Sequence, residues 1–301
     1  MAAPVLDVLC VGHASFDQVF TVPHHPLPDE KLFAESLALC GGGPAANAAI
    51  QGARLGVRTG FSGYLGNDVF GEAHLKELKA SGVDVRGVIR GALPTPLSTV
   101  LVKPGGARSL VNFKGETRAQ RPGAVDYAEM EARVLLFDGH EPGLSESLLP
   151  RTAPKVLDAG SLHAGTLRLM GAVDHLVASE KFAREWLGRD DPPAALQGLS
   201  ALAPVVVAQH IKSGKLRALG VAQGKRVSII AEVPTFAEAG NSALALAVDA
   251  VAMRRVEVGQ GHLAGKARLH GAAAHGGRRS AQHVWPRWVL GFKERHHCVS
   301  P

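Results

Sequence analysis

Residues 41–71 read GGGPAANAAIQGARLGVRTGFSGYLGNDVFG, and this stretch decides the fold class. It opens on three glycines and Pro44, and then becomes alanine-rich, with larger apolar residues at helical spacing. The helical pattern stops at Gly56, and a glycine just past the last helical residue is a common helix end. The stretch therefore predicts a flexible turn that leads into a helix over residues 45–55.

Strand and helix patterns alternate on both sides of this helix. Short apolar runs are typical of buried strands, and alternating runs are typical of strands with one exposed face. The strand candidates are residues 5–11, 16–22, 32–39, 58–65, 134–137, 155–157 and 175–177. We expect another helix over 68–81 and a hairpin of 94–103 with 107–113. This order predicts a mainly parallel sheet with helices on both faces, plus a small additional β layer.

The same stretch resembles the N-terminal signature of the PfkB, or ribokinase-like, carbohydrate kinase family. Supporting motifs lie in order at 12–17 (GHASFD), 76–85 (KELKASGVDV), 95–113, 156–160 (VLDAG) and 173–188 (VDHLVASEKFAREWLG). The resemblance spans about residues 5–207. It implies an α/β fold, a three-layer α/β/α sandwich with a small β-lid made from about residues 15–40 and 95–115. It also implies phosphorylation of a sugar or nucleoside hydroxyl, with ATP and Mg²⁺ as cofactors.

Four residues are the main candidates for binding the sugar: Asp17, Gly41, Gly42 and Asn47. A polyol is held by carboxylate and amide groups, and in the family the positions that match Asp17 and Asn47 hold the substrate hydroxyls. By resemblance, Gly41 and Gly42 admit the sugar close to the backbone and form the pivot of the lid. The alternatives are a solvated Asp17 on an exposed strand face and a plain strand-to-helix turn at the glycines.

Four further residues are weaker candidates for the substrate or nucleotide side of the site. Glu141 and Asp158 each follow a strand. The alternative for both is a loop carboxylate that binds no ligand. Ser179 and Glu180 lie where the family often has an asparagine and a nearby glutamate that organise metal-bound water. Here serine replaces the asparagine and Phe182 stands where the second carboxylate is common, so the metal site is unknown.

The motif that would complete a kinase is missing from the sequence. Phosphoryl transfer to an alcohol needs a base and an anion hole. In the family both come from a late G-A-G-D motif at a helix start. No such motif, and no Walker-type loop, follows Val207; the nearest imitation, at 259–262 (GQGH), has histidine where aspartate is required. We identify no catalytic residue and expect kinase activity to be weak or absent, with the C-terminal part truncated or replaced.

Two segments follow the kinase-like part over 1–207. Residues 210–240 resemble a fragment of the tripartite tricarboxylate transporter solute-binding (Bug) family, through IKSGKLRALGV and EVPTFAEAG. Residues 241–301 resemble neither family and are rich in Ala, Gly, Arg and His. We hypothesise that they are an out-of-frame product. The expected organisation is 1–207 kinase-like, 208–240 Bug-like, and 241–301 a basic tail.

The excess positive charge of the chain lies in residues 241–301. The 301 residues carry a formal net charge of +6, but residues 1–240 contain 24 basic and 24 acidic residues. A polyanionic partner is therefore not expected for the kinase-like part. No apolar run is long enough to span a membrane, and residues 1–13 favour a first strand over a secretory signal. Three widely spaced cysteines suit a reducing compartment, so we expect a cytoplasmic protein.

The expected partner is a small-molecule sugar. The resemblance also raises a homodimer through the β-lid, since lid strands often provide dimer contacts in the family, but the sequence does not determine the oligomeric state. Nucleic acid and membrane are not expected. Three other functions stay open: a non-catalytic sugar-binding protein, a solute-binding protein fragment, and nucleic-acid binding through the basic tail.

Overall fold

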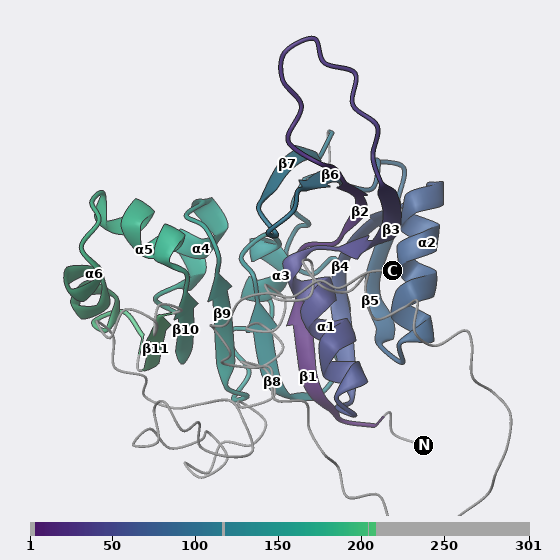
Figure 1. The fold of residues 1–301 in the computed structure, drawn as a ribbon. Helices are drawn as coiled ribbons and strands as arrows, with labels where there is room; N and C mark the ends of the chain where they lie inside the picture. Colours follow the sequence, from purple (N-terminus) through teal and green to yellow (C-terminus); the bar gives the residue numbers. More distant parts are fainter. Residues whose placement is uncertain (1–3, 116–117, 204, 209–301) are drawn as a thin grey trace, which may run out of the picture.

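The computed structural model describes residues 4–115, 118–203 and 205–208. Its body is a seven-stranded sheet in the order β11-β10-β9-β8-β1-β4-β5, in which every pair of neighbours is parallel (Figure 1). The strands are β1 (Leu6–Val11), β4 (Thr59–Gly66), β5 (Asp84–Gly91), β8 (Ala132–Phe137), β9 (Lys155–Ala159), β10 (His175–Ala178) and β11 (Val205–Ala208).

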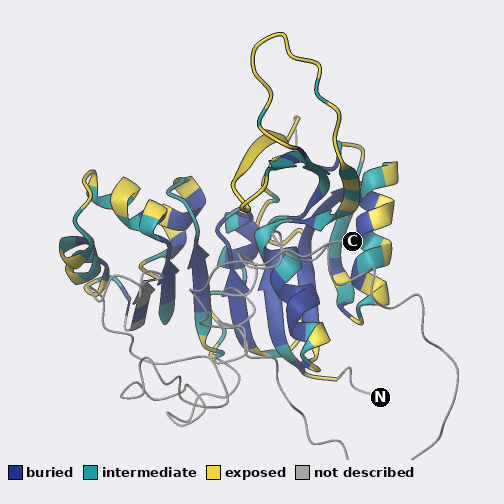
Figure 2. Ribbon diagram, viewed as in Figure 1, coloured by how far each residue is buried: buried dark blue, intermediate teal, exposed yellow. Residues whose placement is uncertain are grey.

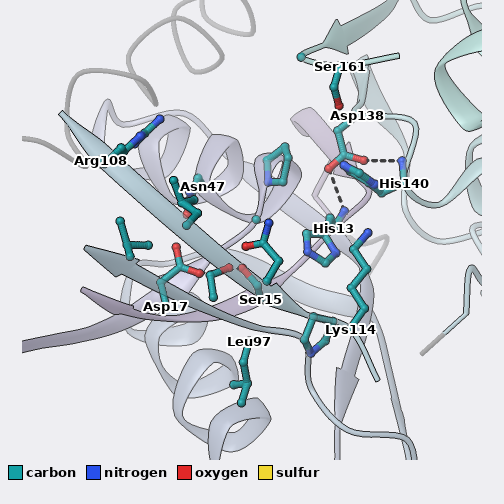
Figure 3. Close-up of a pocket in the computed structure, with 18 of the residues that line it drawn as sticks. His13, Ser15, Asp17, Asn47, Leu97, Arg108, Lys114, Asp138, His140 and Ser161 are labelled. Atoms are coloured by element: carbon teal, nitrogen blue, oxygen red, sulfur yellow. Dashed lines mark hydrogen bonds between the residues drawn. The ribbon is translucent and has the colours of Figure 1, made fainter. Parts of the chain in front are cut away.

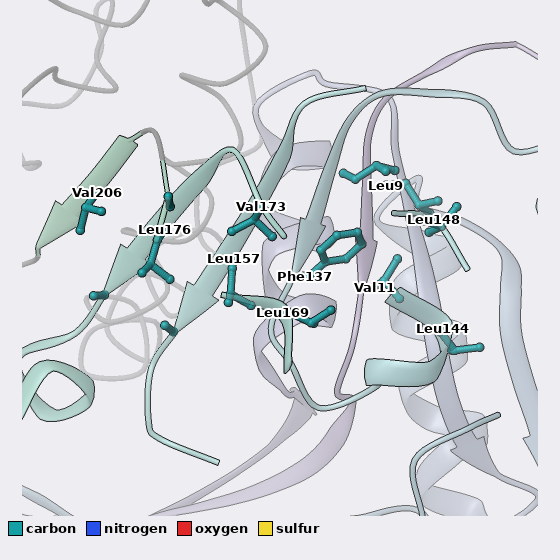
Figure 4. Packing of buried hydrophobic residues seen from close by; sticks show 14 of the residues in the cluster. Leu9, Val11, Phe137, Leu144, Leu148, Leu157, Leu169, Val173, Leu176 and Val206 are labelled. Carbon is teal, nitrogen blue, oxygen red and sulfur yellow. The ribbon is translucent and has the colours of Figure 1, made fainter. Parts of the chain in front are cut away.

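Helices pack on both faces of this sheet and make two separate cores (Figure 2). Side chains alternate along a strand, so Val8 and Cys10 of β1 enter one core while Leu9 and Val11 enter the other. The first core lies under α1 (Pro44–Arg54) and α2 (Val69–Ala80). The second lies under the remaining helices (Figure 4): α3 (Pro142–Glu146), α4 (Ala164–Leu169), α5 (Glu180–Leu187) and α6 (Pro192–Leu199). The expected three-layer α/β/α arrangement is confirmed.

A second, four-stranded sheet forms the lid, in the order β3-β2-β6-β7. Its strands are β2 (Ser15–Thr21), β3 (Ser36–Gly42), β6 (Leu97–Val102) and β7 (Arg108–Phe113). It stands over the carboxyl ends of β1 and β4 (Figure 1), because β2 leaves the body directly after β1. All four strands lie within the ranges 15–40 and 95–115 expected for the lid, except for the last two residues of β3.

The register of the lid strands divides their side chains between two faces. Asp17 is aligned with Cys40 and Ser98, and Ser98 with Asn112. The next row, of opposite orientation, contains Leu39, Gln18, Thr99 and Val111. Since Asp17, Ser98 and Asn112 all line a cavity, the Asp17 row belongs to the inner face of the lid and the Leu39 row to its outer face.

One predicted strand was misplaced. The pattern at 32–39 predicted a strand that ends before the glycines, whereas β3 begins at Ser36 and includes Gly41 and Gly42. The partner strand explains the shift: β2 spans residues 15–21 and pairs Thr21 with Ser36 at one end and Ser15 with Gly42 at the other. The glycines 41 and 42 are therefore strand residues, and the turn into α1 is confined to Gly43.

Other sequence predictions have simpler outcomes. Strands β5 and β11 were not predicted. Among the described residues, no helix combines the length and the apolar character needed to cross a bilayer. The Bug-like segment, the basic tail and the GQGH imitation lie outside the described residues.

Candidate functional site

A cavity of about 710 Å³ lies between the inner face of the lid and the carboxyl ends of the body strands (Figure 3). The lid contributes Ser15, Asp17 and Asn112 to its lining, and the body contributes Asn47 and Asp158. Three of the predicted site residues, Asp17, Asn47 and Asp158, thus line one cavity although they are far apart in the sequence. This is the position where ligands bind in open parallel sheets.

The carboxylate of Asp17 is positioned by its own strand and by the neighbouring one. The hydroxyl of Ser15 donates a hydrogen bond to Oδ1 of Asp17 over 2.9 Å. On the neighbouring strand, a Cβ atom at Gly42 would lie 2.3 Å from both Asp17 carboxylate oxygens. Glycine at position 42 is therefore required for Asp17 to keep this conformation. Gly42 itself does not appear in the cavity lining.

The other two glycines of the cluster have different reasons to be glycine. At Gly41 a Cβ atom would lie 2.2 Å from the ring of the buried His74. The backbone N–H of Gly41 donates a hydrogen bond to Oε2 of Glu77 over 2.6 Å. Gly43 has φ +96°, which favours glycine, and a Cβ atom there would lie 2.3 Å from the carbonyl oxygen of His13. The left-handed turn between lid and body is at Gly43, which lines the cavity. The role of Gly41 and Gly42 as the pivot of the lid stays a prediction.

Asp138 is a functional candidate that the sequence interpretation missed. It follows β8 and is only 2% exposed, yet its carboxylate accepts hydrogen bonds from three backbone N–H groups. These are His13 at 2.8 Å and His140 at 2.9 Å (Figure 3), and Ala45 at 3.1 Å. Burial alone would raise the pKa of Asp138, but nearby His140 and the N–H donors hold it below the usual value. Asp138 therefore joins the ends of β1 and β8 to the first turn of α1, the helix that carries Asn47.

Three histidines form a row beside Asp138. The rings of His13 and His140 are 5.1 Å apart, and those of His140 and His163 are stacked at 4.5 Å. Burial, followed by the charge of His140, lowers the pKa of His163 to about 4. Its ring is therefore neutral at pH 7. All three residues line the cavity, together with Lys114 from the end of the lid. None of them was predicted from the sequence, because single histidines after strands carry no pattern.

The remaining candidates lie around the cavity without lining it. Glu141 is buried at the start of α3 and accepts the backbone N–H of Gln120 over 2.5 Å. Burial, with a contribution from Asp138, raises its pKa to about 7. Ser179 caps α5 by accepting the N–H of Phe182 over 2.9 Å, and Glu180 is the first residue of that helix.

Among the described residues, no group of three or more His, Cys, Asp or Glu side chains is arranged to hold a metal ion by itself. The hydroxyl of Ser179 already donates to the carbonyl oxygen of Gly160 over 2.8 Å in addition to capping α5, and Phe182 is fully buried. The positions where the family often organises metal-bound water are thus occupied by a capping serine and a core aromatic.

Comparison with known proteins gives one family match. The model of the pfkB family carbohydrate kinases matches residues 5–235. The 5-dehydro-2-deoxygluconokinase of Geobacillus kaustophilus is 36% identical, with 70% of this chain and 71% of that protein covered. The nucleoside kinase of Methanothermobacter thermautotrophicus is 35% identical over a shorter region. The chain spans 22–42% of the lengths of four curated relatives that it matches, this nucleoside kinase among them.

Solved structures with the same fold are also found. Ribokinase from Thermotoga maritima superposes with a TM-score of 0.64 at 18% identity, with 85% of this chain and 93% of that one covered. Arabidopsis thaliana ribokinase complexed with ribose and ATP gives 0.58 at 20% identity, with 86% and 92% covered. Identities this low show the fold alone, and they confirm the expected ribokinase-like α/β fold. The Bug-like resemblance at 210–240 has no support, and the family match extends across most of that segment.

Proposed function

Because the chain belongs to the pfkB family of carbohydrate kinases, we propose that it binds a sugar in the lid cavity and is, by family, a phosphotransferase with ATP as donor. One observation carries this proposal. Asp17 on the lid and Asn47 on α1 line the same cavity, where the first offers a carboxylate and the second an amide. Such a pair accepts from and donates to neighbouring hydroxyls of a polyol.

The lid supplies a reason for tight binding and for exclusion of water. Asp17 is held by Ser15 before a ligand arrives, so little of its rotamer freedom is lost on binding. A sugar that contacts both Asp17 and Asn47 connects lid and body, and therefore favours a closed lid. Closure removes water, which competes with the sugar hydroxyl as phosphoryl acceptor.

The catalytic step itself has no assigned residue. No G-A-G-D motif is present in the sequence after Val207, so the family's base and anion hole have no counterpart there. We therefore propose that phosphoryl transfer by this chain is weak or absent, and that a non-catalytic sugar-binding protein is the second candidate function. No step is assigned to Mg²⁺, since a capping serine and a core aromatic occupy the positions where the family often organises metal-bound water. A role for Glu141, Asp158, Ser179 or Glu180 on the nucleotide side stays a prediction.

Two measurements on the full chain test these proposals. Calorimetry without nucleotide over a panel that includes D-ribose, D-fructose and D-gluconate is expected to show binding of at least one sugar. Asp17→Asn is expected to weaken that binding at least tenfold, while the exposed control Asp29→Asn leaves it unchanged. An ADP-release assay with the bound sugar is expected to stay at background. Turnover well above background would contradict the loss of activity, and a panel in which nothing binds would contradict the sugar site.

Exposed apolar side chains on the outer face of the lid favour contact with a partner protein. Leu37 and Leu39 on the edge strand β3 are 51% and 59% exposed, and Val111 and Phe113 on the opposite edge strand β7 are 69% and 57% exposed. An apolar surface of this kind on a small sheet is expected to be covered by another protein surface. We propose that a second copy of the chain covers it and makes a homodimer through the β-lid. A cytoplasmic location also stays a prediction.

A further inference from the structure

The two parts of the cavity differ in charge. Asp17 and Asn47 belong to one part, which we call the hydroxyl end. The other part contains Lys114 together with His13, His140 and His163, and we call it the histidine end. The charge of Lys114 acts on His163, and in the view of Figure 3 its side chain is drawn on the side of His13. The histidine end is rich in N–H donors and carries one ammonium group.

The carboxylates near the histidine end are already engaged. Asp138 accepts its three backbone N–H groups, and Asp158 is 5% exposed and has interactions of its own. Among the described residues, no ion pair is formed by the ammonium of Lys114, although its charge acts on Glu141 and His163. An exposed cation that faces a cavity without a partner carboxylate is available for an anion.

The positions of Lys114 and Asp17 on the lid determine how a charged ligand is oriented in the cavity. Arg108, Leu110 and Asn112 alternate along β7 and all line the cavity, and Lys114 continues the alternation one residue past the end of the strand. Asp17 and Lys114 therefore belong to the same face of the same lid. A ligand with hydroxyls at one end and a negative group at the other meets an acceptor at Asp17 and a donor at Lys114, whereas the reverse orientation is repelled by Asp17.

We propose that the histidine end recognises an anionic group carried by the sugar, a carboxylate or a phosphate, so that the substrate class is an acidic sugar. This rests on the proposed sugar-binding function. The neutral ring of His163 adds an N–H donor that does not require protonation, while Lys114 supplies the charge. The same chemistry suits a phosphate of the nucleotide, so the test has to separate the two sources.

The test compares sugars that differ only in the acidic group. Binding of D-gluconate and D-glucose, and of D-ribonate and D-ribose, is measured by calorimetry on the full chain without nucleotide. In the wild type, the acid of at least one pair is expected to bind about tenfold more tightly than its neutral partner. Lys114→Gln is expected to remove that difference without changing the neutral sugar, and Lys114→Arg to keep it.

Lys103→Gln controls for charge elsewhere on the lid, because it removes one positive charge outside the cavity lining, and it is expected to keep the preference for the acid. Arg108→Gln removes the other positive charge that β7 presents to the cavity, roughly 20 Å along the strand from Lys114. A preference lost in Arg108→Gln and kept in Lys114→Gln would place the anion at the other end and overturn the inference. A preference that survives Lys114→Gln, or equal binding of acid and neutral sugar, would overturn the inference while leaving sugar binding intact. A loss of ATP binding alone would assign Lys114 to the nucleotide and overturn it as well. If no sugar of either kind binds, the proposed function fails with it.

Discussion

The carboxylate of Asp138 accepts a hydrogen bond from the backbone N–H of Ala45 over 3.1 Å, across 93 residues of sequence. Ala45 lies in the first turn of α1, where N–H groups have no partner within the helix. This contact, with those to His13 and His140, fixes the start of the helix that presents Asn47.

Replacing Asp138 is therefore expected to damage the body and the site together. In Asp138→Asn, the amide N–H₂ would replace a carboxylate oxygen that now accepts hydrogen bonds from backbone N–H groups. A donor would then face a donor. We expect a loss of about 2–4 kcal/mol in the free energy of unfolding at pH 7, where the carboxylate is charged. Urea unfolding measures it. Asp126→Asn is the control, because the exposed Asp126 accepts only the N–H of Ala128; an equal loss in both variants would contradict the role given to Asp138.

Gly42→Ala is expected to reduce sugar affinity more than stability. The added methyl would lie within 2.4 Å of the Asp17 carboxylate, which ends a flexible side chain and can rotate away at modest cost. We expect at least tenfold weaker binding with a change of about 1 kcal/mol or less in the free energy of unfolding. Calorimetry and urea unfolding on the same samples separate the two effects. Gly171→Ala is the matched control, since a Cβ atom there meets nothing within 4 Å; unchanged sugar binding in Gly42→Ala would refute this explanation of the glycine.

Glu141 is expected to make stability depend on pH near neutrality. Its pKa is about 7 in the folded protein against an ordinary value of 4.5, so the folded state binds the proton more tightly. Stability therefore falls as pH rises from about 4.5 to about 7, by up to about 3 kcal/mol. Glu141→Gln is expected to flatten this slope, leaving the variant more stable than the wild type at pH 8. Thermal unfolding between pH 4 and pH 8 checks this, with the exposed Glu35→Gln as control; parallel curves for wild type and Glu141→Gln would contradict it.

The outer face of the lid is expected to control the oligomeric state. A lysine at Leu39 or Val111 places a charge beside the exposed apolar side chains of one edge strand of this face, so Leu39→Lys and Val111→Lys should convert dimers into monomers. Light scattering after size exclusion measures the mass. Leu167→Lys, at a site on α4 that is 47% exposed, is expected to stay dimeric. A monomeric wild type would disprove pairing through the lid.

The sequence predicted the body well because its strands bury both faces and leave clear apolar runs. The apolar runs at 5–11 and 134–137 correspond to β1 and β8, whose ends differ from the prediction by one or two residues. The lid was harder, since the end of β3 depends on where β2 begins and not on its own residues. Asp17 and Asn47 were found through a motif, whereas Asp138 and the histidine row were not. Their roles arise from backbone groups and rings brought together by separate strands, which no local spacing records.

The order of the lid strands has a consequence for how the protein folds. The β2–β3 hairpin leaves the chain between β1 and α1, and the β6–β7 hairpin leaves it after β5. The two hairpins meet only through the pairing of β2 with β6, which joins Asp17 to Ser98. The exits of the two hairpins follow β1 and β5, which β4 joins side by side in the body sheet. We therefore expect β2 to pair with β6 after these body strands have associated, and the amides of the lid to exchange with solvent before those of the central strands.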